Sequence, residues 1–251
     1  MLVLGIVGSP RKGGKTSALV DAALEGAAEA GARTQKVFLV DYDVKPLTNP
    51  DGDRQAGCPD ALSALCEDAD AIVLGAPVYY GDINGLTKDF MDSVRIGNSN
   101  GKPAVGFAIA GGSGKGLLSG VQSIYHFLYH RQLRAIDPTP VSRFNMDAAL
   151  NSLRVSGVKL VDAVKAMSPF SGADWNGRWG EVLAYYATLP YFNCDPLDEF
   201  VMLAEQLIRI STGDNVALAK AELDQANVLI DKELRSAAAL YAVKAYELLY
   251  F

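Results

Sequence analysis

Residues 5–20, GIVGSPRKGGKTSALV, join an apolar segment to a helix through a loop rich in glycine and basic residues. The apolar segment, within residues 1–8, is the nearly continuous run expected of a parallel strand that is covered on both faces. Residues 16–30 follow as a predicted helix that ends at Gly31. The free amides and the dipole at the start of such a helix favour an anion. The stretch therefore predicts a strand, a phosphate-binding loop and a helix.

Neither of the two common nucleotide motifs fits this loop. A Walker A loop has the pattern G-x-x-x-x-G-K-[ST], but five residues before Gly14 the chain has Ser9 in place of glycine. The dinucleotide pattern G-x-G-x-x-G is also missing after the first strand. The hydroxyl groups and cations of the loop remain as candidate phosphate ligands, and they are Ser9, Arg11, Lys12, Lys15, Thr16 and Ser17.

Strand-like and helix-like segments alternate through the first two-thirds of the chain. The pattern predicts further strands within residues 32–40, 70–77, 102–112 and 138–144, and helices at 59–67, 84–94, 116–133 and 146–167. Short connections in such an alternation lead to parallel strands joined by right-handed crossovers. The sequence therefore predicts an α/β fold with a doubly wound, five-stranded parallel sheet of order 2-1-3-4-5.

Two more glycine-rich loops follow the third and fourth predicted strands. They are GAPVYYGDING, residues 75–85, and AGGSGKG, residues 110–116. In a doubly wound sheet, ligands bind beyond the carboxyl ends of the strands, at the point where the winding reverses. We therefore expect the three loops to converge on one crevice. The first loop would supply phosphate donors, the second aromatic faces, and the third glycine amides that allow a flat ring to approach closely.

The motifs GSPRKGGKTSAL, residues 8–19, and DAIVLGAPVYYGDINGLTKDFMDS, residues 70–93, together resemble the NADPH-dependent FMN reductase family of flavodoxin-like proteins. The resemblance is nearest to the branch that includes the iron–sulfur flavoproteins and covers roughly residues 1–167. It implies that FMN binds with its phosphate on the six loop residues named above. It also implies that the isoalloxazine ring lies between two groups of residues, Pro77, Val78, Tyr79, Tyr80 and Gly81 on one side and Gly111, Gly112, Ser113 and Gly114 on the other.

The chain departs from that family pattern in its cysteines. Iron–sulfur members carry a compact cysteine cluster between the second strand and the next helix, but the corresponding residues 44–62 keep only Cys58. One thiolate cannot hold a cluster that needs four, so the sequence predicts FMN without an iron–sulfur cluster. Lys15 also replaces the usual asparagine of the phosphate loop, and Asp92-Ser93 replaces a family Asp-Arg pair.

The resemblance implies an oxidoreductase that passes hydride from NADPH or NADH through FMN to an acceptor. The acceptor would be a quinone, a free flavin, a nitro or azo compound, or a redox protein. Because the flavin carries this chemistry, no side chain is assigned a catalytic role. Two alternatives stay open: an FMN-binding electron-transfer protein without NAD(P)H activity, and a nucleotide binder of the P-loop type.

Composition limits the other classes of function. The net charge of −6 over 251 residues argues against a nucleic-acid partner. No apolar stretch reaches the ~18–20 residues of a membrane span, and no signal peptide is evident, so we expect a cytoplasmic protein.

The cysteines Cys58, Cys66 and Cys194 form no C-x-x-C pair. His126 and His130 have a spacing that could bind a metal, but no third ligand accompanies them, and no metal is predicted.

The pattern changes after residue 167, which divides the chain into an FMN-binding domain, residues 1–167, and a helical extension, residues 168–251. Asp195-Pro196 is a strong helix start. A single last helix of about 35 residues, about 50 Å long, is expected from residue 214 onward. Its predicted apolar stripe comprises Leu223, Ala226, Ile230, Leu234, Ala237, Tyr241, Ala245 and Leu248.

The role of the extension is left open by the sequence. Its last helix could pack on its own domain, or it could form an interface between subunits. The extension would then act as a lid, as an oligomerisation element, or as both. We expect a homodimer or a homotetramer.

Overall fold

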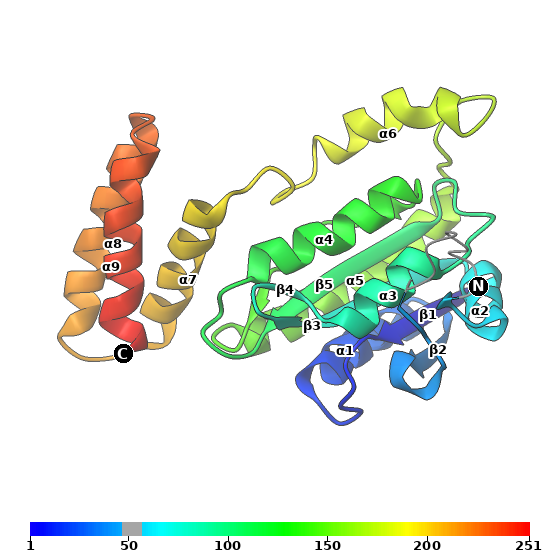
Figure 1. The fold of residues 1–251 in the computed structure, drawn as a ribbon, viewed down its shortest axis with the longest axis horizontal. Coiled ribbons are helices and arrows are strands. Elements are labelled where there is room, and N and C mark those ends of the chain that lie inside the picture. Colours follow the sequence, from blue (N-terminus) through cyan, green and yellow to red (C-terminus); the bar gives the residue numbers. More distant parts are fainter. Residues whose placement is uncertain (47–56) are drawn as a thin grey trace.

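The computed structural model describes residues 1–46 and 57–251 (Figure 1). Its parallel sheet has the order β2-β1-β3-β5-β6, which confirms the predicted doubly wound arrangement. The four longer strands are β1 (Leu2–Val7), β2 (Arg33–Phe38), β3 (Ala71–Tyr79) and β5 (Pro103–Ala110).

The described residues form seven strands instead of five, for two local reasons. The fifth strand is split into β6 (Arg134–Ala135) and β7 (Val141–Ser142), and both pieces pair with β5. Pro138 and Pro140 lie between them, and proline cannot donate to a strand ladder. The other addition is β4 (Asp82–Ile83), which folds back antiparallel on the end of β3.

Helices cover both faces of the sheet because apolar residues point alternately to each side of its strands. Val3, Val73 and Val105 pack under α1 (Lys15–Glu29) and α5 (Met146–Ala166). Leu4, Ile72 and Ala104 belong to the core on the other face. That face is covered by α2 (Asp60–Asp68), α3 (Gly85–Ser93) and α4 (Leu117–His130).

The segment after α5 returns along the edge of the sheet before the last helices begin. It contains a 3-10 turn at Asn176–Arg178 and then α6 (Trp179–Tyr186). Another 3-10 turn, Leu39–Asp41, follows β2. The Tyr186 hydroxyl donates to the Leu133 carbonyl at 2.7 Å, and the Tyr185 hydroxyl donates to the Ala135 carbonyl at 2.5 Å. These two bonds attach α6 beside the edge strand β6.

Three helices end the chain: α7 (Pro196–Ile210), α8 (Asn215–Asp231) and α9 (Arg235–Tyr250). They stand beside the end of the sheet at which the parallel strands finish (Figure 1). No helix within the described ranges is both long enough and apolar enough to cross a membrane.

The prediction of one long last helix is wrong, because the chain turns between α8 and α9. Glu233 has a positive φ of 61°, and the two helices then pack antiparallel against each other (Figure 1). Three alanines at this contact are fully buried, and they are Ala226, Ala238 and Ala242. Their small side chains allow α8 and α9 to approach each other closely, a contact that a single straight helix could not make. Leu234, a member of the predicted stripe, is 52% exposed because it lies in the turn.

The close contact between α1 and α5 can be tested by adding one methyl group. A Cβ on Gly157 would lie 1.9 Å from the Ala23 carbonyl oxygen, so Gly157→Ala forces the helices apart. We expect the free energy of unfolding to fall by about 2 kcal/mol in urea denaturation. The matched control is Gly180→Ala at an exposed position of α6, where no atom lies within 4 Å of the added Cβ and stability should not fall. Equal stability of both variants would contradict this packing.

Candidate functional site

The loop between β1 and α1 presents polar groups at the end of the sheet. Ser9 and Thr16 are buried, whereas Arg11 and Lys15 extend from the exposed surface of the loop. Gly14 is the N-cap of α1, with φ −90° and ψ 175°. Because glycine has no side chain, it leaves the amides of the first turn available to an anion. The local geometry is therefore one that can accept an anion such as a phosphate group.

Two residues that the sequence analysis did not select hold this loop in place. The Asn84 side chain donates to the Gly8 carbonyl at 2.9 Å, and the Thr87 hydroxyl donates to Asn84 Oδ1 at 2.7 Å. Both side chains are buried. A Cβ on Gly8 would lie 1.9 Å from Thr87 Oγ1, so only glycine fits there. The sequence signal was Asn84 at a helix start, but its partner is 76 residues away.

The three predicted loops line one cavity of about 500 Å³. That volume is within the usual range for a site that binds a small molecule. The first loop contributes six residues, the last residues of β3 contribute three, and the region where β5 ends contributes three. The lining residues are Ser9, Arg11, Gly13, Gly14, Lys15, Thr16, Pro77, Val78, Tyr79, Ile109, Gly111 and Gly112.

Two predicted phosphate ligands contact other parts of the chain in this structure. Lys12 forms an ion pair with Asp41, with 2.5 Å between Nζ and Oδ1. The Ser17 hydroxyl accepts a hydrogen bond from the Lys36 ammonium at 3.2 Å. Neither side chain lines the cavity. Their role as ligands stays a prediction, whereas Ser9, Arg11, Lys15 and Thr16 all lie on the cavity wall.

The predicted ring residues also divide into two groups. Pro77, Val78, Tyr79, Gly111 and Gly112 line the cavity. The other predicted ring residues form the ends of the two loops: Tyr80 is fully exposed with φ 51°, Gly81 has φ 87°, Ser113 is half-buried, and Gly114 is buried with φ 87°. These four stay predicted ligands.

The cavity has the chemistry that FMN requires. Buried hydroxyls, helix amides and cations lie at the end formed by the first loop, which suits a phosphate monoester. A Cβ on Gly111 or Gly112 would have no atom within 4 Å, so the third loop leaves open space for a flat ring. The residues present therefore fit FMN.

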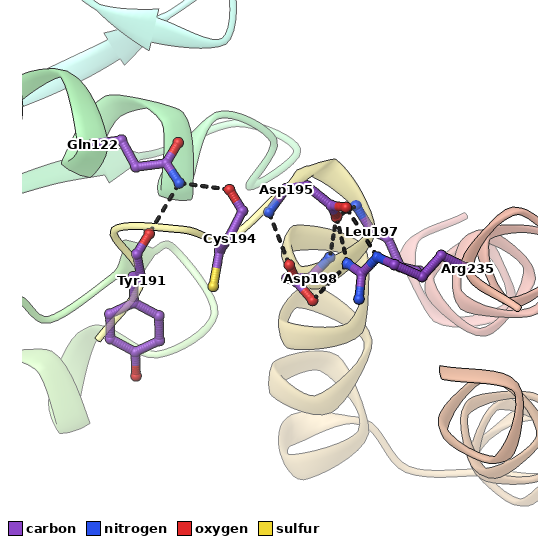
Figure 2. Close-up of polar contacts among 7 residues, drawn as sticks. All are labelled: Gln122, Tyr191, Cys194, Asp195, Leu197, Asp198 and Arg235. Atoms are coloured by element: carbon purple, nitrogen blue, oxygen red, sulfur yellow. Dashed lines mark hydrogen bonds and ion pairs between the residues drawn. The ribbon is translucent and has the colours of Figure 1, made fainter. Parts of the chain in front are cut away.

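The cysteines do not offer the ligands of an iron–sulfur cluster. The Ser63 hydroxyl donates to Cys58 Sγ at 3.7 Å, and burial raises the pKa of the Cys58 thiol. Burial also raises the pKa of Cys66 to about 12, which favours the neutral thiol over the thiolate. Cys194 lies just before α7 (Figure 2). Three cysteines cannot supply four thiolates from one chain.

The histidine pair on α4 packs with aromatic rings. The His126 ring contacts Phe192 at a centroid distance of 5.2 Å, and burial lowers the pKa of this imidazole. His130 packs edge-on against Tyr129 and Trp179. Within residues 1–46 and 57–251, no three His, Cys, Asp or Glu residues gather in a way that could hold a metal ion.

This sheet order, with a phosphate-type loop after the first strand, defines a flavodoxin-like protein. The sequence profile of the NADPH-dependent FMN reductase family matches residues 1–144. The chain belongs to this family, and its class is that of the FMN-dependent oxidoreductases.

Known relatives of this chain are named as iron–sulfur flavoproteins. An iron–sulfur flavoprotein of Methanocaldococcus jannaschii is 32% identical over 190 residues, which cover 66% of this chain and 98% of the relative. An iron–sulfur flavoprotein of Methanosarcina thermophila is 32% identical over 140 residues, covering 51% of this chain and 73% of the relative.

Solved structures support the fold. An NAD(P)H:quinone oxidoreductase from Methanothermobacter marburgensis aligns with a TM-score of 0.51 and 18% identity, over 64% of this chain and 98% of that chain. An archaeal flavodoxin aligns with a TM-score of 0.50 and 19% identity, over 66% and 99% of the two chains.

The contact between Asn84 and Gly8 gives a direct test of how the phosphate loop is held. In Asn84→Ala the buried Gly8 carbonyl loses a donor, so the free energy of unfolding should fall by about 2 kcal/mol. Urea denaturation measures this difference. The control is Asn98→Ala, whose exposed side chain donates to the Glu67 carbonyl at 2.9 Å and whose loss should cost less than about 0.5 kcal/mol. If the two variants lose the same stability, the buried contact is not important.

Proposed function

We propose that this protein binds FMN in the cavity and uses it to oxidise NADPH or NADH and to reduce a second substrate. The observation that carries the proposal is the convergence of three loops on one cavity, with phosphate-binding groups on one of them and open glycine backbone on another. Membership of the NADPH-dependent FMN reductase family supports it independently.

Each loop has a distinct part in binding. Ser9, Thr16 and the first amides of α1 would donate to the phosphate, and Arg11 and Lys15 would neutralise its charge. Pro77–Tyr79 and Gly111–Gly112 would enclose the ring. When bound, FMN supplies hydride acceptance and the release of one or two electrons.

The remaining tasks of the chain are to orient the ring and to shape its surroundings. Asp82, a carboxylate within the ring-side loop, accepts from the Ile83 amide at 2.6 Å and so stabilises the β3–β4 hairpin. We therefore assign it a structural role in the turn and assign no proton-transfer residue. The acceptor that we propose is a quinone, a flavin, a nitro or azo compound, or a redox protein.

An absorption spectrum followed by anaerobic reduction tests the proposal. The purified protein, as isolated or after incubation with FMN, should show the absorption spectrum of a bound oxidised flavin. Anaerobic addition of NADPH or NADH should reduce this flavin, and so remove its visible absorbance, in the time of one catalytic turnover. A protein that stays colourless and does not take up FMN would refute the proposal. A bound flavin that neither nucleotide reduces would favour the electron-transfer protein.

The predicted absence of an iron–sulfur cluster is tested on the same sample. Iron and acid-labile sulfide should both be far below the flavin content, because the chain has three cysteines in total. Stoichiometric iron and sulfide would show that chains share their cysteines, and it would overturn this part of the proposal.

Lys15→Gln separates phosphate binding from ring binding. The Kd for FMN should rise about tenfold because one charge-assisted contact to the phosphate is lost, as measured by quenching of flavin fluorescence. The Kd for riboflavin, which has no phosphate, should not change. Lys159→Gln, at an exposed lysine of α5, is the matched control. An equal loss of affinity for both flavins would contradict the assigned role.

A further inference from the structure

The last helices reach back to the third loop of the cavity through two polar side chains. On α7, Glu199 Oε1 accepts from the Gly116 amide at 2.8 Å, and Oε2 accepts from the Leu118 amide at 3.0 Å. On α9, the Tyr246 hydroxyl donates to the Ser113 carbonyl at 2.9 Å. Because these amides are at the start of α4, the Glu199 carboxylate acts as a cap supplied by a distant helix.

The start of α7 is held against α4 by a second set of contacts (Figure 2). The Gln122 side chain of α4 donates to the Tyr191 carbonyl at 2.9 Å and to the Cys194 carbonyl at 2.6 Å. These two bonds fix the turn that precedes α7. As a result, α7 begins at a defined place beside α4.

The first turn of α7 is itself fixed by a capping box and by a cation from α9 (Figure 2). Asp195 accepts from the Leu197 amide at 2.8 Å, and Asp198 accepts from the Asp195 amide at 2.8 Å. Arg235 pairs with Asp195 at 2.8 Å and with Asp198 at 3.0 Å. Glu199 is the next residue along, so its direction follows from this anchored turn.

Apolar packing seats the third loop on the same helices. Leu203 of α7 and Tyr246 of α9 are buried in one cluster with Ala110 and Phe144, which flank the loop from the sheet side. A Cβ on Gly114 would lie 2.5 Å from a methyl group of Leu203. The loop therefore has no room to move toward α7.

The third loop in turn supports the second one. Gly116 has φ 91°, and a Cβ there would lie 2.6 Å from Gly81 Cα. The Ser119 hydroxyl donates to the Gly81 carbonyl. Loops 79–82 and 111–116 thus pack against each other, and a shift of one requires a shift of the other.

We propose that Glu199 and Tyr246 are positioning residues that hold both ring-side loops, 79–82 and 111–116, in the arrangement that accepts the flavin. The proposal rests on the proposed function, since it assigns these loops to FMN. Loops that are ordered before binding lose less conformational entropy when the ligand arrives, so affinity rises. Helices α7–α9, residues 196–250, lie beyond the family match at residues 1–144. Glu199 and Tyr246 therefore belong to the part of this chain outside that match.

Glu199→Gln tests the role of the carboxylate, and Glu205→Gln is its matched control on the same helix. Glu205 is partly exposed and pairs with Arg209 at 3.4 Å. In apo protein, hydrogen exchange at 79–82 and 111–118 should accelerate about tenfold in Glu199→Gln and not in the control. The Kd for FMN should rise about tenfold in the same variant. Tyr246→Phe, which removes only one hydroxyl, should shift both measurements in the same direction.

The outcomes separate this inference from the proposed function. If wild-type protein binds FMN and Glu199→Gln matches Glu205→Gln in both measurements, the inference fails and the function stands. Faster loop exchange with an unchanged Kd would also overturn it, because ordered loops would then not aid binding. If wild-type protein does not bind FMN, the function fails, and the exchange data on apo protein still decide whether Glu199 holds the loops. If Glu199→Gln does not fold, Tyr246→Phe decides the question alone.

Discussion

The pairing of β1 with β3 is the constraint on which the cavity depends. Their register ends with Val7 opposite Gly75, and one more bond, from the Gly8 amide to the Gly75 carbonyl at 2.7 Å, continues it into the loops. The Asn84 side chain then donates a further bond to the Gly8 carbonyl at 2.9 Å. Because the strands are parallel, both loops leave the same edge of the sheet, and these two hydrogen bonds join them there.

The C-terminal helices extend this principle to the other side of the cavity. The first loop is held by the sheet domain itself, through Asn84 and Thr87. The third loop is held from outside, by Glu199 and Tyr246. One site is thus supported by residues that are far apart in the sequence. The C-terminal helices contact a loop that leaves the sheet, so they help to hold that loop in place. A cavity built from glycine-rich loops needs such support, since glycine itself favours many conformations.

Sequence reasoning succeeded where a local pattern has a strong physical cause. Buried parallel strands need continuous apolar runs, and residues 71–79 and 103–110 match their predicted positions within a few residues. The helix start at Asp195 was also readable, because a capping aspartate followed by proline satisfies the first amides locally. The prediction failed at residues 232–234, because the turn between α8 and α9 is stabilised by packing between alanines on two helices.

The sequence by itself determined the fold class, the phosphate-type loop and nine of the twelve residues that line the cavity, with Gly13, Gly14 and Ile109 outside the predicted ligands. The fold class and the anion loop follow from local composition, because apolar runs make buried strands and glycine beside hydroxyl and basic groups makes an anion loop. The five lining residues on the ring side, Pro77–Tyr79, Gly111 and Gly112, were implied by the resemblance to a known family. Only the tertiary structure decided that Lys12 pairs with Asp41, that Asn84 supports Gly8, and that Glu199 caps α4. Each of these contacts joins residues from different elements, and their meeting depends on how whole helices and strands pack, which no local pattern encodes.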